Sequence, residues 1–206
     1  MKSASRLFLI PFVASTSLAA DFTMNGSSYS VEHITGSGPS KTLLELDFGT
    51  NAAPQPHLFA YQWDPATTPS VNGRTLLQAL QADSFGVAFT DTFFASFNSY
   101  FLNTLWYQTN MPPDAYPDSF WYLFTSSDGT TWSESQIGYD QTTIPNNSFF
   151  AWGLQHDDPN LPAGYPFPPL PASHYPAAIT AVPEPASLLL GLPVVALLLI
   201  RRRISH

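Results

Sequence analysis

The chain has 206 residues, no cysteine, an aromatic content of 15% and a formal net charge of −8 at pH 7. The absence of cysteine excludes disulfides, thiol catalysis, iron–sulfur clusters and cysteine zinc sites. Five of the seven basic residues lie at the two ends of the chain, which leaves Lys41 and Arg74 against fourteen acidic residues between them. This acidity excludes nucleic acid and argues against anionic membranes as partners, because phosphate binding depends on Lys and Arg.

The N-terminus predicts a secretory signal peptide over residues 1–20. A short basic start is followed by an apolar run and then by small residues. The small residues Ser17 and Ala19 fit cleavage after Ala19, and cleavage after Ala20 is the alternative. We therefore expect an exported protein whose mature chain begins at Ala20 or Asp21, with signal peptidase and the secretion machinery as partners.

Residues 21–158 predict one extracytoplasmic β-rich domain, because the segment is rich in aromatic residues and these favour strands. Over residues 41–48, Leu44 and Leu46 alternate with Glu45, which predicts a half-buried strand. Further strands are predicted at 29–34, 58–63, 85–90, 100–107, 120–125 and 148–154.

A different periodicity predicts one helix at about 75–83. Leu76, Leu77 and Leu80 fall on one side of this segment, and Thr75 with Gln78 fits a capping box. The expected fold is therefore α+β and strand-dominated, a curved, mainly antiparallel sheet with one packed helix. An all-β sandwich is the alternative.

Turn residues separate the predicted strands. Asp128-Gly129 predicts a hairpin, because both residue types tolerate positive φ, and Asn146-Asn147 marks another turn. The segment from Ser126 to Trp132 is similar to the Asp-box hairpin of sialidase-type propellers, with one residue fewer between Asp and Gly. In that family the box is a folding element, so we interpret this single copy as a plain hairpin.

Residues 159–182 predict a proline-rich spacer between the domain and the C-terminal tail. Nine of the twenty prolines lie between residues 159 and 185, in a stretch without Lys or Arg. Such a composition favours an extended, polyproline-like chain. A proline-rich ligand for an aromatic groove is the alternative.

The last 24 residues, 183–206, have the composition of a membrane-directed tail. The Pro-Glu-Pro triplet is extended because each proline fixes its own φ and biases the residue before it away from helix. Residues 186–200 are uncharged and predict a transmembrane helix of about 22 Å, which is short against a hydrocarbon core of about 30 Å. The arginines after it are expected on the cytoplasmic side. The residues in question are Pro183, Glu184, Pro185, Arg201, Arg202 and Arg203.

The order of triplet, apolar helix and arginine cluster resembles the PEP-CTERM sorting signal. The resemblance implies an exosortase-type membrane protease as partner, an intermediate inserted in the inner membrane through the C-terminal helix, and a mature protein at the cell surface or outside the cell. It also implies bacteria that produce extracellular polysaccharide, a further candidate partner. An ordinary single-pass tail anchor is the alternative.

The middle of the chain resembles the transcobalamin-like module, a small α+β domain in which one helix packs on a curved sheet. In this family vitamin binding belongs to particular members, and no cobalamin-contacting motif is found in this sequence. The resemblance is carried by Asp47-Phe48-Gly49, Tyr61-Gln62-Trp63-Asp64, the Leu76–Leu80 segment, Trp121-Tyr122 and residues 146–154.

The sequence predicts no catalytic or cofactor-binding residue. Glu32-His33 is a poor chelate, because adjacent residues of a strand point to opposite faces. His156-Asp157-Asp158 is interpreted as a solvated loop, although these carboxylates with Asp140 leave calcium open. Neither a Gly-x-Ser-x-Gly motif nor a phosphate-binding glycine loop is present.

Three functions follow from the sequence. The first is an exported, non-enzymatic surface or matrix protein processed at its tail. The second is a small-ligand or carbohydrate-binding module that uses exposed aromatic rings, although core packing is the expected fate of each tryptophan. The third is a hydrolase with an unrecognised site, for which His156 or Asp158 would be essential.

Overall fold

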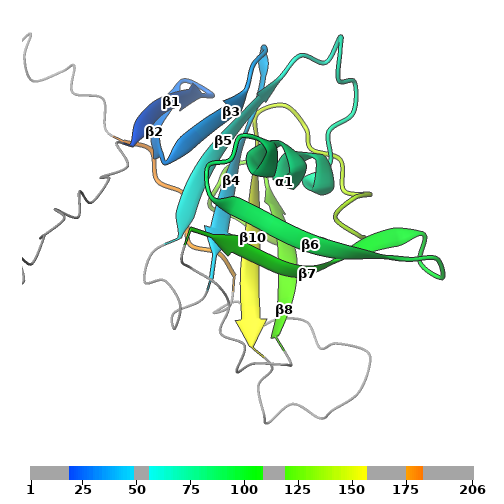
Figure 1. Cartoon of the computed structure of the whole chain (residues 1–206). Helices are drawn as coiled ribbons and strands as arrows, with labels where there is room; N and C mark the ends of the chain where they lie inside the picture. Colours follow the sequence, from blue (N-terminus) through cyan, green and yellow to red (C-terminus); the bar gives the residue numbers. More distant parts are fainter. Residues whose placement is uncertain (1–18, 49–55, 109–118, 157–174, 183–206) are drawn as a thin grey trace, which may run out of the picture.

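The computed structural model describes residues 19–48, 56–108, 119–156 and 175–182 (Figure 1). These residues form a strand-dominated α+β fold with one helix and mainly antiparallel strands, which confirms the predicted class. Most of the predicted signal peptide and all of the predicted tail, including the helix expected at 186–200, lie outside them. Within the described part of the chain, no helix is both long and apolar enough to cross a membrane.

A six-stranded sheet forms the centre of the fold, and two hairpins and the helix surround it. The sheet has the order β3-β5-β4-β10-β8-β9, in which β3 with β5 and β4 with β10 are parallel pairs. The hairpins are β1–β2 and β6–β7. The elements are β1 (Ala20–Met24), β2 (Ser27–Val31), β3 (His33–Gly36), β4 (Ser40–Asp47), β5 (His57–Trp63), α1 (Gly73–Ala82), β6 (Val87–Phe94), β7 (Ser99–Tyr107), β8 (Ser119–Ser126), β9 (Ser133–Glu134) and β10 (Ser148–His156).

Both faces of the central sheet are covered, so the domain has three layers. On one face, Leu44 and Phe59 of the sheet pack in a common core with the leucines of α1 and with the base of the β6–β7 hairpin. On the other face, Leu43 and Phe124 pack with the β1–β2 hairpin and with Ile179, which lies far along the chain. The central sheet is therefore buried on both faces.

The expectation that residues 41–48 form a half-buried strand is wrong. Glu45 is only 2% exposed, and Leu43 on the same face is fully buried. The reason is tertiary, because the β1–β2 hairpin and residues 175–182 cover a face that the alternation alone assigns to solvent.

The helix begins earlier than the sequence predicted. Its N-cap is Asn72, whose Oδ1 accepts hydrogen bonds from the backbone N–H and the hydroxyl of Thr75, both at 2.9 Å. Thr75 is therefore the partner of the cap and not the cap itself. The face expected to be buried is confirmed, since Leu76, Leu77 and Leu80 are all buried.

The N-terminal strands also differ from the prediction. The strand expected at 29–34 is two strands, because the chain bends at Glu32 and passes from the β1–β2 hairpin to the central sheet. Strand β1 was not predicted. The hairpin expected at Asp128-Gly129 is confirmed, with β8 paired to β9 and Gly129 at φ +73°.

Candidate functional site

Exposed aromatic side chains gather on the β6–β7 hairpin. This hairpin extends from the body of the domain (Figure 1). Of the six large hydrophobic side chains that are exposed among the described residues, four lie on it, and Phe97 in its turn is 61% exposed. The ring of Phe101 lies 5.0 Å from that of Phe94 and 5.5 Å from that of Phe97. Contiguous exposed apolar groups of this kind mark interaction sites in soluble proteins.

The pairing register separates the hairpin into two faces. Asp91 pairs with Leu102 and Phe93 with Tyr100. This side is the inner face, on which Leu102 and Tyr100 pack against the core and Asp91 contacts Arg74 of α1, while Phe93 stays exposed. Between the pairs Thr90–Thr104 and Asp91–Leu102 the register shifts, so Asn103 is an extra, unpaired residue of β7 and forms a bulge. The opposite side, which we call the outer face, holds Ala88, Thr90, Thr92, Phe94, Phe97, Phe101, Asn103, Thr104 and Trp106.

The outer face combines rings with hydroxyl and amide groups and carries no ionisable side chain. Asn103 Nδ2 donates to Thr92 Oγ1 at 2.8 Å, and the hydroxyls of Thr90 and Thr104 hydrogen-bond to each other. Trp106 is partly exposed and belongs to neither core. The face therefore offers apolar surface with hydrogen-bonding groups placed beside it.

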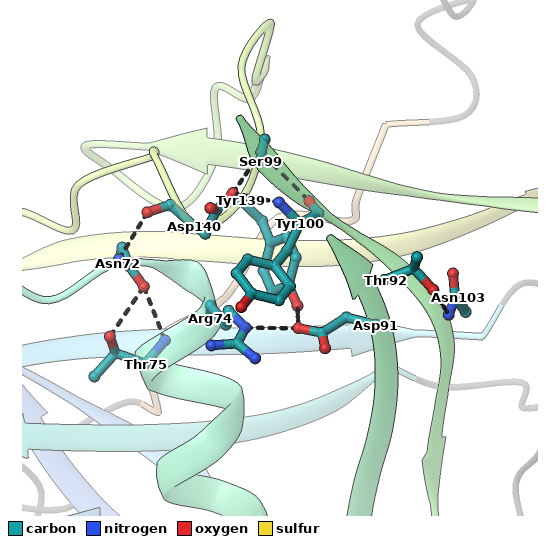
Figure 2. Close-up of polar contacts among 10 residues, drawn as sticks. All are labelled: Asn72, Arg74, Thr75, Asp91, Thr92, Ser99, Tyr100, Asn103, Tyr139 and Asp140. Carbon is teal, nitrogen blue, oxygen red and sulfur yellow. Dashed lines mark hydrogen bonds and ion pairs between the residues drawn. The ribbon is translucent and has the colours of Figure 1, made fainter. Parts of the chain in front are cut away.

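A polar network on the inner face attaches the hairpin to the domain (Figure 2). Arg74 of α1 donates from Nε to Asp91 Oδ2 at 2.6 Å, and the hydroxyl of Tyr139 donates to the same oxygen. The guanidinium of Arg74 also lies over the ring of Tyr100, 3.7 Å from its centroid. Figure 2 shows Asp91 directed toward these partners, whereas Thr92 lies on the other side of the ribbon.

A second set of contacts holds the start of β7. The side chain of Asp140 accepts hydrogen bonds from the hydroxyl of Ser99 and the backbone N–H of Tyr100, and its carbonyl accepts from Asn72 Nδ2 at 2.7 Å. The loop passes so close that a Cβ on Gly138 would meet Ser99 Oγ at 1.7 Å. Any larger residue at this crossing would therefore displace Ser99 from its hydrogen bond to Asp140.

The electrostatics of the network follow from Arg74. Burial by itself raises the pKa of Asp91, but hydrogen bonds from Arg74 and Tyr139 and the charge of Arg74 outweigh it and lower that pKa. Burial and the hydrogen bond to Asp91 raise the pKa of the Tyr139 hydroxyl. The network thus consists of an ionised pair with a neutral phenol at neutral pH.

We expect Arg74→Met to lower the free energy of unfolding by about 2–3 kcal/mol at pH 7, because it leaves the partly buried carboxylate of Asp91 without its cation. A carboxyl with a lowered pKa stabilises the fold above its unfolded pKa of about 3.9, and this contribution disappears as the pH falls through the folded value. The loss should therefore shrink toward pH 3. Urea denaturation of Arg74→Met and of the exposed control Gln78→Met checks this, and an equal loss at both pH values contradicts it.

Two histidine–carboxylate pairs lie where β2 meets β3. His57 Nδ1 lies 2.6 Å from Glu32 Oε1, and His33 Nε2 lies 3.2 Å from an oxygen of Asp83. Glu32 and His33 thus contact different partners, His57 and Asp83. Burial alone raises the pKa of Glu32, but hydrogen bonds from His57 and Tyr107 reverse the shift and lower it. These pairs connect strands and the end of the helix.

Residues 175–182, which we call the return segment, lie against the domain. The backbone N–H of Ile179 donates to Gly129 O at 2.8 Å, that of Val182 donates to Ser28 O at 2.7 Å, and the indole N–H of Trp132 donates to Ala177 O at 3.1 Å. The folded unit therefore reaches beyond the boundary predicted at residue 158.

Glu45 lies beneath the return segment. Its carboxyl is bonded by the backbone amide of Ala177, while Oε1 has no hydrogen-bond partner among the described residues. Burial, with the charge of Asp47, raises the pKa of Glu45 to about 8. This carboxyl is therefore neutral at pH 7.

The predicted sorting residues, Pro183 to Pro185 and Arg201 to Arg203, lie outside the described residues. Of the predicted cleavage residues, Ala19 is exposed and Ala20 begins β1. Asp157 and Asp158 also lie outside the described residues. The side chain of Asp140 accepts hydrogen bonds from Ser99 and Tyr100 of the β6–β7 hairpin. In the described ranges, no three His, Asp or Glu side chains are gathered to hold a metal ion.

The aromatic platform differs from the one that the tryptophans suggested. Trp63, Trp132 and Trp152 are buried, as expected for core residues, Trp106 is partly exposed, and the most exposed rings are phenylalanines. The sequence does contain a signal for these exposed rings. Phe93 and Phe94 directly precede a turn that includes Phe97 and has neither glycine nor proline, whereas hairpin turns are normally polar.

Comparison with known proteins assigns the chain to no family: no family model matches it, and no curated protein matches it. The resemblances to the PEP-CTERM signal and to the transcobalamin-like module therefore stay predictions.

Proposed function

We propose that this chain is an exported, non-enzymatic surface protein, sorted and processed through its C-terminal tail. The observation that supports the proposal best is that the described part of the fold reaches both predicted processing sites. Its first strand begins at Ala20, beside the predicted signal cleavage site, and its last described contact is the bridge between Ser28 and Val182, directly before Pro183.

Both proposed cleavages would leave the domain intact. The buried hydrophobic residues among those described run from Phe22 to Ile179, so both proposed cleavage sites lie outside this range, and Ala20 packs against its edge as a partly buried residue. The first strand is paired from Ala20 to Met24, which fits a mature chain that starts at Ala20 or Asp21. A domain that keeps its core after processing suits a mature extracellular protein.

The bridge between Ser28 and Val182 attaches the residue before the predicted tail to the same hairpin in which β1 begins at Ala20. In the proposed sequence of events, signal peptidase acts after export and the helix at 186–200 holds the intermediate in the inner membrane. An exosortase-type protease then acts at Pro183, Glu184 and Pro185. The acidic domain, with a net charge of about −12 when histidines are neutral, fits a location away from nucleic acid.

Intact-mass measurement of the secreted protein tests this proposal. In a host with an exosortase-type protease we expect a chain that starts at Ala20 or Asp21 and has lost the residues after the triplet. Alanine at Pro183, Glu184 and Pro185 should leave the tail attached, whereas the control Thr180→Ala should be processed normally. A secreted chain that keeps its arginines in this host, or a chain that stays in the cytoplasm, contradicts the proposal.

A further inference from the structure

We propose that the outer face of the β6–β7 hairpin binds an uncharged polysaccharide. The inference rests on the proposed function only in placing this face outside the cell, and it names the ligand that the domain would hold there. Sugar rings have an apolar face and a rim of hydroxyls, so they need aromatic surface with hydrogen-bonding groups beside it. The outer face provides both.

The arrangement along the hairpin suits a chain of sugars better than a single small ligand. Phe94, Phe97 and Phe101 form one cluster near the turn, and Trp106 lies toward the domain. At about 3.3 Å per strand residue, Phe101 and Trp106 are separated by roughly 15 Å. The surface between two aromatic ends is therefore long enough for more than one sugar ring, and it is open rather than enclosed.

Polar side chains occupy the interval between the rings. Thr92 with Asn103 and Thr90 with Thr104 hydrogen-bond within each pair, which fixes their orientation. Each hydroxyl and the Asn103 amide retain further donor or acceptor positions. These groups can bond sugar hydroxyls at little additional cost in side-chain entropy, because they are already ordered.

Charge limits the class of ligand. The outer face has no ionisable side chain, and the domain around it has a formal net charge of about −12 when every carboxyl is counted as ionised. An anionic polymer or an anionic lipid surface is repelled by this domain, whereas an uncharged polymer is not. Insertion into hydrocarbon is also disfavoured, since the threonines and Asn103 would lose water without gaining partners.

A second copy of the chain is a poorer occupant. Three rings of about half exposure offer roughly 300 Å² of apolar surface, on the basis of 150–250 Å² for a whole aromatic side chain. Stable interfaces need about 800 Å² from each partner. The network at Arg74 and Asp91 holds the inner face rigidly, so the outer face is presented in a single orientation that favours ligand binding.

Affinity electrophoresis of the purified full chain in mild detergent tests the proposal. The gels contain an uncharged glucan, an uncharged galactan or a polyuronate. We expect retardation by at least one uncharged polymer and none by the polyuronate. Phe101→Ala should weaken binding about tenfold, as expected for a central aromatic contact. Phe101→Trp should retain binding.

Phe93→Ala is the matched control, because Phe93 is an exposed phenylalanine on the inner face of the same hairpin. It should bind within twofold of the wild type. Two further measurements test the other occupants. Flotation with phosphatidylcholine and phosphatidylglycerol vesicles tests lipid binding, and sedimentation analysis tests dimer formation. Both compare wild type with a variant in which Phe94, Phe97 and Phe101 are all replaced by alanine.

Several results overturn the inference. One is that no uncharged polymer binds the protein. Another is that the combined alanine variant binds as well as wild type. The last is that the combined variant loses vesicle binding or dimer formation but keeps polymer binding. The outcome does not depend on export, since the protein is purified and assayed directly. Failure here is therefore distinguishable from failure of the processing experiment.

Discussion

Glu45→Gln is expected to stabilise the protein by up to roughly 4–5 kcal/mol at pH 9 while it changes stability little at pH 5. The wild-type carboxyl is buried on β4, between the central sheet and the return segment, and burial raises its pKa to about 8. Above that pH the folded protein holds a buried negative charge with little compensation. Glutamine has nearly the same shape and remains neutral at every pH.

The direction follows from proton binding. The unfolded carboxyl loses its proton near pH 4.3, whereas the folded one keeps it to about pH 8. Between these values the folded state binds more protons than the unfolded state, so stability falls as the pH rises from about 4.5 to about 8 and then levels off. The contribution of protonated Glu45 is therefore complete at low pH and lost at high pH.

Urea denaturation from pH 5 to pH 9 measures this effect as the difference between Glu45→Gln and wild type. Asp21→Asn serves as the control, because it removes one negative charge from an exposed position on β1. Its curve should parallel that of the wild type. A constant difference between Glu45→Gln and wild type over the whole range contradicts the assignment of the raised pKa to burial of Glu45.

Much of the domain could be predicted from the sequence because its periodicities are local. The strands around Phe59, Leu105 and Phe150 and the leucine face of α1 repeat at the periods of strand and helix, and the structure places them as expected. Strand β1 was missed because Phe22 and Met24 lie beside the predicted signal peptide, where a short alternation is easily assigned to the predicted cleavage region.

The burial of Glu45 was not predictable from local sequence. An acidic residue between two leucines has the pattern of a strand with one solvated face. Its actual environment depends on the β1–β2 hairpin and on Ile179, more than a hundred residues away. The parallel pairing of β4 with β10 is equally remote in sequence, so no short-range pattern specifies it.

The candidate binding surface was predicted only as a class of side chain. Aromatic content indicated possible sugar-binding rings, but which rings are exposed depends on the bulge at Thr90/Asp91 and on the attachment of the hairpin by Arg74. The bulge changes the side of β7 on which each residue lies, so Phe101 and Asn103 could not be assigned to a face by counting alternate residues.

Ile179→Ala is expected to lower the free energy of unfolding by about 2–4 kcal/mol at pH 5, the usual cost of truncating a buried isoleucine. Ile179 is 8% exposed and packs with Phe22, Val31 and Phe124 against the sheet. If the sequence-based boundary at residue 158 described the folded unit, this residue would lie in a solvated spacer and its truncation would cost almost nothing. Urea denaturation distinguishes the two cases.

Thr180→Ala is the matched control, because Thr180 is the exposed neighbour of Ile179 in the same segment. It should remain within about 0.5 kcal/mol of wild type, as surface substitutions usually do. Hydrogen exchange adds a local measurement. Since the N–H of Val182 bonds to Ser28, loosening the return segment should also speed exchange in the β1–β2 hairpin. Equal stabilities for the two variants contradict the packing role of Ile179.

The same substitution should alter the pH dependence that Glu45 causes. The return segment excludes water from Glu45 and provides the Ala177 amide that bonds to it. When Ile179→Ala loosens that segment, water can solvate the ionised carboxylate, and the energetic cost of deprotonation at high pH decreases. The stability difference between Ile179→Ala and wild type should therefore be larger at pH 5 than at pH 9. When both proteins also carry Glu45→Gln, the stability lost through Ile179→Ala should be the same at pH 5 and at pH 9, because no titrating carboxyl then remains beneath the segment.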